Sequence, residues 1–269
     1  METSTSSWET HEELIATENG IELTRFIDSL SPSETARAVS RLPESRQIRL
    51  LGLLSPEDAA EVIEDIPEAQ AADLVEEMSA EKAAAIMEEL QSDHLVDVLG
   101  EMGEAASRAI LEKMPTEDAE EARMLLAYPP DSAGGLMISE YLVCRTDQTI
   151  QDVLDDFKAN QEEYVGYHVQ YCYVVDSYGK LEGVLRIHDL LFPSRTTELS
   201  RIMITNPLSV PDNASLKDLQ DFFNEHRLFG VPVVDDERRL VGVVLPEAVE
   251  EALNERKTKT FLRLSGIIG

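Results

Sequence analysis

Cysteine is nearly absent from this chain, with two residues among 269. So few cysteines exclude a disulfide-rich scaffold, and the lack of a Cys-x-x-Cys pair excludes the common structural zinc motifs. Cys144 and Cys172 both lie in apolar, strand-like runs. We therefore expect them to be buried, reduced thiols of a cytosolic protein.

Long apolar runs and catalytic motifs are missing as well. No stretch approaches the ~18 apolar residues of a membrane-spanning helix, so this stretch of chain is expected to be soluble. The five histidines, at positions 11, 94, 168, 188 and 226, are too scattered for the paired ligands of a transition-metal site. The chain has no glycine-rich phosphate loop and no recognisable nucleophile and base motif. We therefore expect a protein that is not an enzyme.

Basic residues are scarce, because Lys and Arg number 23 against 53 Asp and Glu, for a net charge of −30. Such a field repels nucleic acid and attracts cations, which excludes nucleic acid as a partner. The hydrophobic fraction of 43% is ample for packed cores and excludes a disordered acidic chain. Residues 1–130 hold 30 acids and nine bases, so the charge is uneven and two different domains are expected.

A twelve-residue repeat runs through the first half of the chain. Four positions in each unit are mostly apolar, as in Ala59, Val62, Ile63 and Ile66, and this spacing marks one face of an α-helix. Serine and proline stand where several helices would begin, as N-cap and first helical residue. An apolar residue recurs at every twelfth position, namely Leu30, Leu42, Leu54, Ile66, Met78, Leu90, Met102, Met114 and Leu126.

Helices of about nine residues are marginally stable alone, so these helices must stack on one another. Stacked helix pairs predict a curved α-solenoid over residues 20–127, after a disordered tail of residues 1–19. The repeat ends at Ala127-Tyr-Pro-Pro130, followed by Asp131-Ser-Ala-Gly-Gly135. Prolines stop helices and glycines permit unusual backbone angles, so residues 128–136 are predicted to be a linker between domains.

Beyond the linker, one pattern of strands and helices occurs twice. Residues 173–186 recur as residues 232–245 at a constant offset of 59. The first copy predicts strands at Tyr141–Cys144, Tyr171–Asp176 and Gly183–Arg186, with helices at Thr149–Asn160 and Ile187–Phe192. The sequence therefore predicts an α + α/β chain: an α-solenoid followed by a duplicated β-α-β-β-α unit.

The duplicated unit resembles a tandem pair of CBS (cystathionine-β-synthase-like) domains, at residues 137–198 and 199–255. Short helical repeats, the segment Ala133-Gly-Gly-Leu-Met137 with Glu140-Tyr-Leu-Val143 behind it, and a CBS pair together resemble the cytosolic part of the MgtE family of magnesium channels. The resemblance implies a homodimer formed through the CBS domains, at the cytosolic face of the cell membrane. It also implies that residues 256–269 begin the family's plug helix, which leads to a transmembrane domain beyond residue 269.

The same resemblance implies magnesium sensing, in which Mg²⁺ ions bridge acidic domain surfaces and favour a closed channel. Matched residue by residue, the family's magnesium acids are Glu61, Asp93, Asp97 and Glu251. Mg²⁺ keeps several waters and needs only one or two protein carboxylates, so scattered acids suffice. The family's other acids are replaced here, which predicts fewer ions or basic groups in their place; the replacements are Ser215, Lys217, Arg227, Ala248 and Thr260. Most acids of the repeat are expected only to solvate its helices.

Adenine nucleotide, either ATP or AMP, is the second cofactor that the CBS resemblance implies. Tyr171 would stack on the base and Asp189 would accept hydrogen bonds from the ribose. Asp189 fits equally well as a helix-start acid favoured by the helix dipole. Ala248 occupies the matching place in the second repeat, so one nucleotide site at most is expected. Two alternatives therefore stay open: a soluble CBS regulator that binds a nucleotide and a protein partner, and a scaffold built on the helical repeats.

Overall fold

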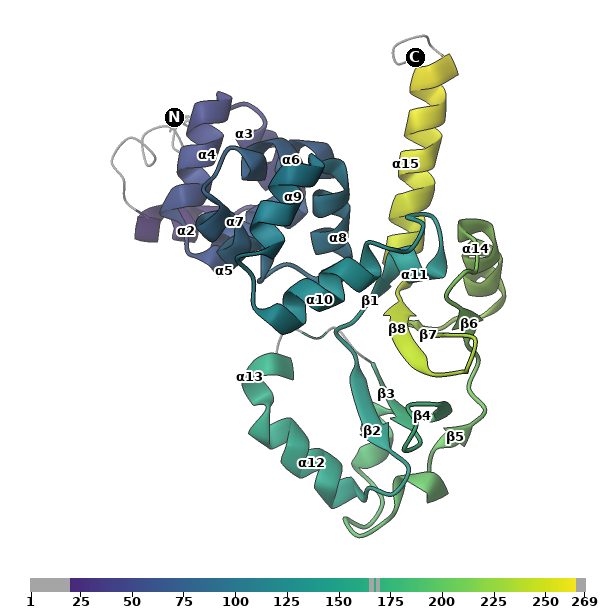
Figure 1. The fold of residues 1–269 in the computed structure, drawn as a ribbon. Helices are drawn as coiled ribbons and strands as arrows, with labels where there is room; N and C mark the ends of the chain where they lie inside the picture. The colour runs from purple at the N-terminus through teal and green to yellow at the C-terminus, as the bar shows by residue number, and fades with distance from the viewer. Residues whose placement is uncertain (1–19, 165–166, 168–169, 265–269) are drawn as a thin grey trace, which may run out of the picture. The chain divides into compact units, whose positions relative to one another are not determined.

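This computed structural model describes residues 20–164, 167 and 170–264. The predicted tail of residues 1–19 and residues 265–269 lie outside the described residues. The chain divides into two compact units, Met1–Leu126 and Ala127–Gly269, and each unit is treated by itself. The first is built from helices and the second from sheets with helices (Figure 1). Among the described residues, no helix is both long and apolar enough to span a membrane.

The first unit is a stack of short helices that begin at intervals of twelve residues, which confirms the repeat. Their bounds are α2 (Gly20–Ile27), α3 (Pro32–Val39), α4 (Glu44–Leu53), α5 (Pro56–Asp65), α6 (Glu68–Glu76), α7 (Ala80–Met87), α8 (Ser92–Glu101), α9 (Glu104–Leu111) and α10 (Thr116–Leu125). Serine caps several of these helices as predicted: the Ser55 hydroxyl accepts a hydrogen bond from the Asp58 backbone N–H at 3.1 Å. Pro56 follows as the first helical residue.

Alternate helices of this stack pack on each other. One row consists of α3, α5, α7 and α9, and the other of α4, α6, α8 and α10. The apolar positions of the repeat, among them Ile63, Leu74 and Met87, form one continuous buried core. A helix pair is therefore the structural unit, and the predicted α-solenoid is confirmed.

The second unit contains two four-stranded sheets. One has the order β2 (Leu142–Arg145), β3 (Tyr171–Val175), β4 (Leu181–Arg186), β5 (Ile204–Thr205). The other has the order β1 (Met137–Ile138), β8 (Leu240–Val244), β7 (Val231–Val234), β6 (Val210–Pro211). The helical segments are α11 (Ala133–Leu136), α12 (Ile150–Ala159), α13 (Gln161–Tyr164), η1 (Ile187–Leu190), η2 (Leu199–Arg201), α14 (Leu216–Glu225) and α15 (Pro246–Leu264). The predicted helix at Ile187–Phe192 is thus only a short 3-10 turn.

Each CBS repeat lends a strand to the sheet of the other. The strand β1, at the start of the first repeat, pairs antiparallel with β8 of the second, and β5 of the second pairs antiparallel with β4 of the first. A glycine lies under each lent strand: a Cβ on Gly242 would lie 2.6 Å from Cγ of Met137, and one on Gly183 would lie 2.8 Å from Cγ of Met203. The two repeats are therefore folded into one body.

The glycines of the predicted linker have a different structural role from the one expected from the sequence. Gly134 and Gly135 have ordinary backbone angles and lie buried in α11. Their role is close packing, because a Cβ on Gly134 would overlap the Tyr128 ring and one on Gly135 would lie 2.9 Å from Cα of Pro130. The expectation of unusual backbone angles was wrong, since the local constraint is space.

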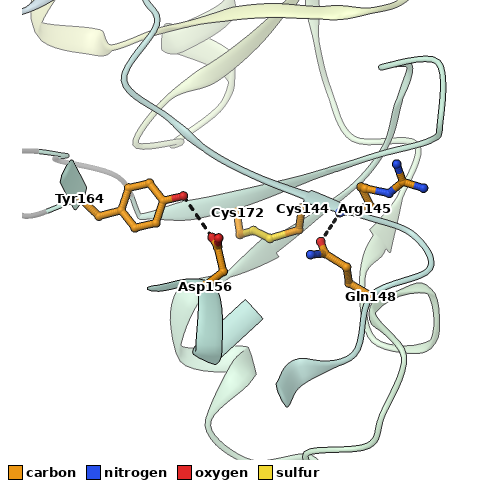
Figure 2. Close-up of a disulfide and its surroundings, with 6 residues drawn as sticks. All are labelled: Cys144, Arg145, Gln148, Asp156, Tyr164 and Cys172. Carbon is orange, nitrogen blue, oxygen red and sulfur yellow. Dashed lines mark hydrogen bonds between the residues drawn. A yellow bond between two sulfur atoms is a disulfide. The ribbon is translucent and has the colours of Figure 1, made fainter. Parts of the chain in front are cut away.

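The two cysteines form a disulfide, which corrects the expectation of reduced thiols. Strands β2 and β3 pair parallel with Leu142 opposite Cys172 and Cys144 opposite Val174, so the cysteines are diagonal neighbours on one sheet face. Their Cα atoms lie 6.6 Å apart, and the bridge is buried. Figure 2 shows the bridge between the Arg145–Gln148 turn and the Tyr164–Asp156 hydrogen bond of 3.0 Å. This register is invisible in the sequence, so the pairing could not be predicted.

Candidate functional site

A cavity of about 510 Å³ lies within the second unit, between the two CBS repeats. Its volume is in the range of small-molecule sites. Its walls come from β3, β4, the β5 region and the segment before β7: Tyr171, Tyr173, Val184, Arg186, Ile204, Asn206, Pro207, Leu208, Arg227, Leu228, Phe229, Gly230 and Pro232. No acid is among these lining residues, although the whole chain carries a net charge of −30. The cavity thus suits an aromatic ligand that bears negative charge.

Aromatic rings from both repeats meet at this cavity. The ring centroids of Tyr171, at the start of β3, and Phe229, before β7, are 6.4 Å apart. The exposed fraction of Phe229 is 66%, which is unusual for so large an apolar side chain. Tyr173 is buried beside them, and burial raises the pKa of its phenol. Its hydroxyl has no hydrogen-bond partner among the described residues. Two rings are therefore available to pack against a flat ligand, and the predicted base-stacking role of Tyr171 stays a prediction.

Asp189, the predicted ribose acceptor, lies in η1 next to the cavity but is not one of its lining residues. Its carboxylate accepts two hydrogen bonds from Arg186, at 3.0 Å from Nε and 3.3 Å from the terminal nitrogen. Nε2 of His188 lies 3.1 Å from the same carboxylate. The Arg186 guanidinium holds the pKa of Asp189 below its usual range. Asp189 therefore fixes Arg186, which does line the cavity.

The acids of the first unit divide into structural and available ones. Glu64 accepts a hydrogen bond from the backbone N–H of Gln91 at 3.3 Å, and Glu76 does the same for Gly103. Gln91 and Gly103 are the N-caps of α8 and α9. The two acids, on α5 and α6, therefore provide hydrogen-bond acceptors for the N-termini of helices in the other row. Glu64 and Glu76, which occupy the same position in successive repeats, therefore have a structural role.

Glu61, on α5, is exposed and lies in a field of like charge. Partial burial raises the pKa of its carboxyl, and the charges of Asp28, Asp58, Glu57 and Glu64 raise it further. A carboxylate surrounded in this way gains from a bound cation, because the cation removes the repulsion. Glu61 is thus the predicted magnesium residue for which the structure provides the strongest electrostatic reason.

The other predicted metal residues lie on separate elements. Asp93 and Asp97 are half-buried one turn apart on α8, and the Asp93 carboxylate accepts a hydrogen bond from the His94 backbone N–H at 2.8 Å. Glu251 is exposed on α15, in the second unit. Within the described ranges, no three His, Cys, Asp or Glu side chains are gathered closely enough to hold a metal ion. The predicted metal residues therefore form no closed cage within one unit, and the assignment stays a prediction.

The positions where acids were expected are placed as follows. Ser215 caps α14, and its hydroxyl donates a hydrogen bond of 2.6 Å to the Asp218 carboxylate. Lys217 is exposed on α14, Arg227 lines the cavity, and Ala248 lies at the start of α15. Thr260 falls in α15, and its side chain lies outside the described part. Basic or neutral groups hold all the described positions.

Sequence reasoning missed the cavity residues of the second repeat. Arg227 was noticed only as a replaced acid, and Phe229 and the Asn206–Leu208 segment were not noticed. Asn206 gives one signal that becomes visible only in the structure, a left-handed backbone with φ 50°. The 59-residue offset between the repeats does not predict these residues, because it pairs Tyr171 with Gly230 and Arg186 with Leu245. The cavity is asymmetric, although the sequence is duplicated.

Comparison with known families identifies both units. The model of the MgtE intracellular N domain matches residues 30–131. The CBS domain model matches twice, at residues 133–193 and 199–255. The order of domains is the one the sequence resemblance implied.

The curated relatives include magnesium transporters. The magnesium transporter MgtE of Thermus thermophilus is 31% identical over 147 residues, which are 55% of this chain and 32% of that protein. The MgtE of Enterococcus faecalis is 26% identical over 56% of this chain and 33% of that protein. The chain thus spans about a third of the length of these relatives. An inosine-5'-monophosphate dehydrogenase of Nitrosopumilus maritimus matches 42% of this chain at 30% identity, over 22% of its own length.

Solved structures match the described fold over most of its length. The crystal structure of the soluble part of a magnesium transporter gives a TM-score of 0.82 at 23% identity and covers 93% of this chain and 98% of that one. The cytosolic domain of the Mg²⁺ channel MgtE in complex with ATP gives a TM-score of 0.82 at 25% identity and covers 91% of this chain and 99% of that one.

Proposed function

Because the chain belongs to the MgtE family, with that family's N domain and a CBS pair, we propose that it is the magnesium-sensing regulatory region of a magnesium transporter. The proposal includes a homodimer formed through the CBS domains, a transmembrane domain in the same protein, and a place at the cytosolic face of the cell membrane. Magnesium is then the signal and the cargo, and no enzymatic activity is proposed.

The observation that supports the proposal is Glu61 on α5, whose carboxylate lies among four other acids. Carboxylates about 6 Å apart repel by about 3 kcal/mol at an effective dielectric near 20. Partial burial is the main cause of the raised pKa of Glu61, and the neighbouring carboxylates raise it further, which supports such a repulsion. A divalent ion held by one or two of these acids and several waters would reverse the repulsion, so ions bridging acidic surfaces would favour the closed state.

We expect millimolar Mg²⁺ to compact this chain in solution, because ions between acidic surfaces remove their repulsion. Small-angle scattering with EDTA and with Mg²⁺ measures the change in radius of gyration. The compaction should weaken in Asp93→Asn with Asp97→Asn. The control Glu117→Gln with Glu120→Gln makes the same change of charge on exposed positions of α10 and should respond like the wild type. Identical wild-type profiles in the two buffers would refute magnesium sensing by this region.

Glu61→Gln should stabilise the first unit when no divalent ion is present. A carboxyl with a raised pKa in the folded state binds its proton more tightly there than in the unfolded state. Its contribution to stability therefore falls as pH rises through that pKa, and the amide avoids this loss at neutral pH. Thermal melts in EDTA should show a higher midpoint for Glu61→Gln, and a smaller gain on adding Mg²⁺. A lower midpoint in EDTA would show that the Glu61 charge is not unfavourable.

A second candidate function is adenine nucleotide binding, favoured by the cavity with Tyr171 in its wall. The related MgtE cytosolic domain that was solved with ATP supports this choice. Calorimetry with ATP and AMP should show binding that is lost in Tyr171→Ala. Asp189→Ala tests the ribose contact, which the hydrogen bonds from Arg186 compete with. Absence of heat with either nucleotide would remove this function and leave magnesium sensing standing.

A further inference from the structure

We propose that Arg227 is a specificity residue of the cavity, which selects ligands by their phosphate groups, so that nucleoside di- and triphosphates bind more tightly than nucleosides. This inference rests on the proposed nucleotide binding and goes beyond it, because it assigns the residue that recognises the phosphate groups.

The first observation is an uncompensated positive charge. Two arginines, Arg186 and Arg227, line the cavity, and no lining residue is acidic. Arg186 is already neutralised by the Asp189 carboxylate, at 3.0 Å. Arg227 forms no ion pair with any residue that the structure describes. In a chain with a net charge of −30, a free cation at an acid-free cavity marks a place for an anionic group.

The second observation is where Arg227 stands relative to the aromatic wall. Phe229, which meets Tyr171, is two residues further along the chain. Two residues of chain span at most about 7 Å, and the arginine side chain can reach a similar distance. A ligand whose ring packs against Tyr171 and Phe229 would therefore have its polar tail within reach of the Arg227 guanidinium. Guanidinium groups bind phosphate oxygens in a bidentate manner, which a lysine cannot do.

The third observation is the backbone of Asn206 in the same cavity wall. A φ of 50° is uncommon outside glycine, and such conformations gather at binding sites because the surrounding structure must enforce them. The Asn206–Leu208 segment lines the cavity together with residues of β3 and β4 from the first repeat. Both repeats thus contribute residues to the cavity, and the arginine that would bind phosphate, Arg227, comes from the second.

The test is calorimetry with adenosine, AMP, ADP and ATP in EDTA, on the wild type and on Arg227→Gln. Wild-type affinity should increase with each phosphate and weaken with added salt, whereas adenosine binding should not depend on salt. Arg227→Gln should lower ATP affinity about tenfold to hundredfold, the usual effect of one charged hydrogen-bonding partner. Adenosine affinity should stay within about twofold. Arg201→Gln, the same change of charge outside the cavity, should behave like the wild type.

Two results would overturn the proposal while the nucleotide site stands. One is a wild type that binds adenosine as tightly as ATP. The other is an Arg227→Gln variant that loses adenosine and ATP by the same factor, which would mean that Arg227 shapes the cavity and does not contact phosphate. If the wild type binds neither ligand, nucleotide binding itself fails, and the phosphate role of Arg227 fails with it.

Discussion

Removing the disulfide between Cys144 and Cys172 is expected to lower the free energy of unfolding of the CBS pair by about 3–4 kcal/mol. The bridge joins positions 28 residues apart, and closing a loop of that size in the unfolded chain accounts for this magnitude in the chain-entropy model. Urea denaturation of wild type and of Cys144→Ala with Cys172→Ala, followed by circular dichroism, measures the difference. The loss should be confined to the transition of the second unit, because the first unit contains no cysteine.

The double variant also removes two buried sulfur atoms, so a second measurement separates packing from cross-linking. Wild type treated with a phosphine reductant retains both sulfur atoms and should lose most of the same free energy. Thiol titration in guanidinium should detect no free thiol before reduction and both thiols after it. Two thiols that react in unreduced, unfolded protein would show that the bridge does not form and would restore the expectation of reduced cysteines.

The solenoid could be predicted from the sequence because the start and the buried face of each helix are set by residues within one repeat. Ser55, Pro56 and the apolar positions of α5 define its start and its buried face within a single twelve-residue unit, and neighbouring units repeat the same pattern. The β half follows less directly. The lent strands β1 and β5 have two residues each, too short for any periodic signal, and their partners are far away in sequence.

The candidate sites show the same limit in sharper form. Tyr171 could be suggested as a base-stacking residue from the CBS resemblance, whereas Phe229 meets it only through the packing of the second repeat on the first. Register decides the cysteine pair, since a shift of one residue between β2 and β3 would point the two side chains to opposite faces. The acids present the opposite case. The sequence offers many acids that could bind a cation. The structure separates them by their hydrogen-bond partners, as with Glu64, which accepts a hydrogen bond from the N-cap of α8.

The exchange of strands between the CBS repeats packs Met137 over Gly242, and we expect substitutions at these two positions to lower the free energy of unfolding. A Cβ at residue 242 would lie 2.6 Å from Cγ and 2.9 Å from Cβ of Met137, so more than the flexible end of the side chain must move. Gly242→Ala should therefore cost about 1–3 kcal/mol through overpacking. Met137→Ala should cost about 2–5 kcal/mol, because Met137 is buried and its loss leaves a cavity.

The double variant distinguishes this packing from two unrelated losses. Alanine at 137 vacates the space that alanine at 242 needs, so the combined cost should fall short of the sum by about 1 kcal/mol or more. Gly100→Ala is the control, since an added Cβ there meets nothing within 4 Å and a helix gains from the change. Costs that add within about 0.5 kcal/mol would mean that Met137 does not lie on β8. Coupling of the expected size would instead show that the start of the first repeat packs on the last strand of the second. The segment after α10 would then be part of the folded CBS body, and a force applied to it would be transmitted to both repeats.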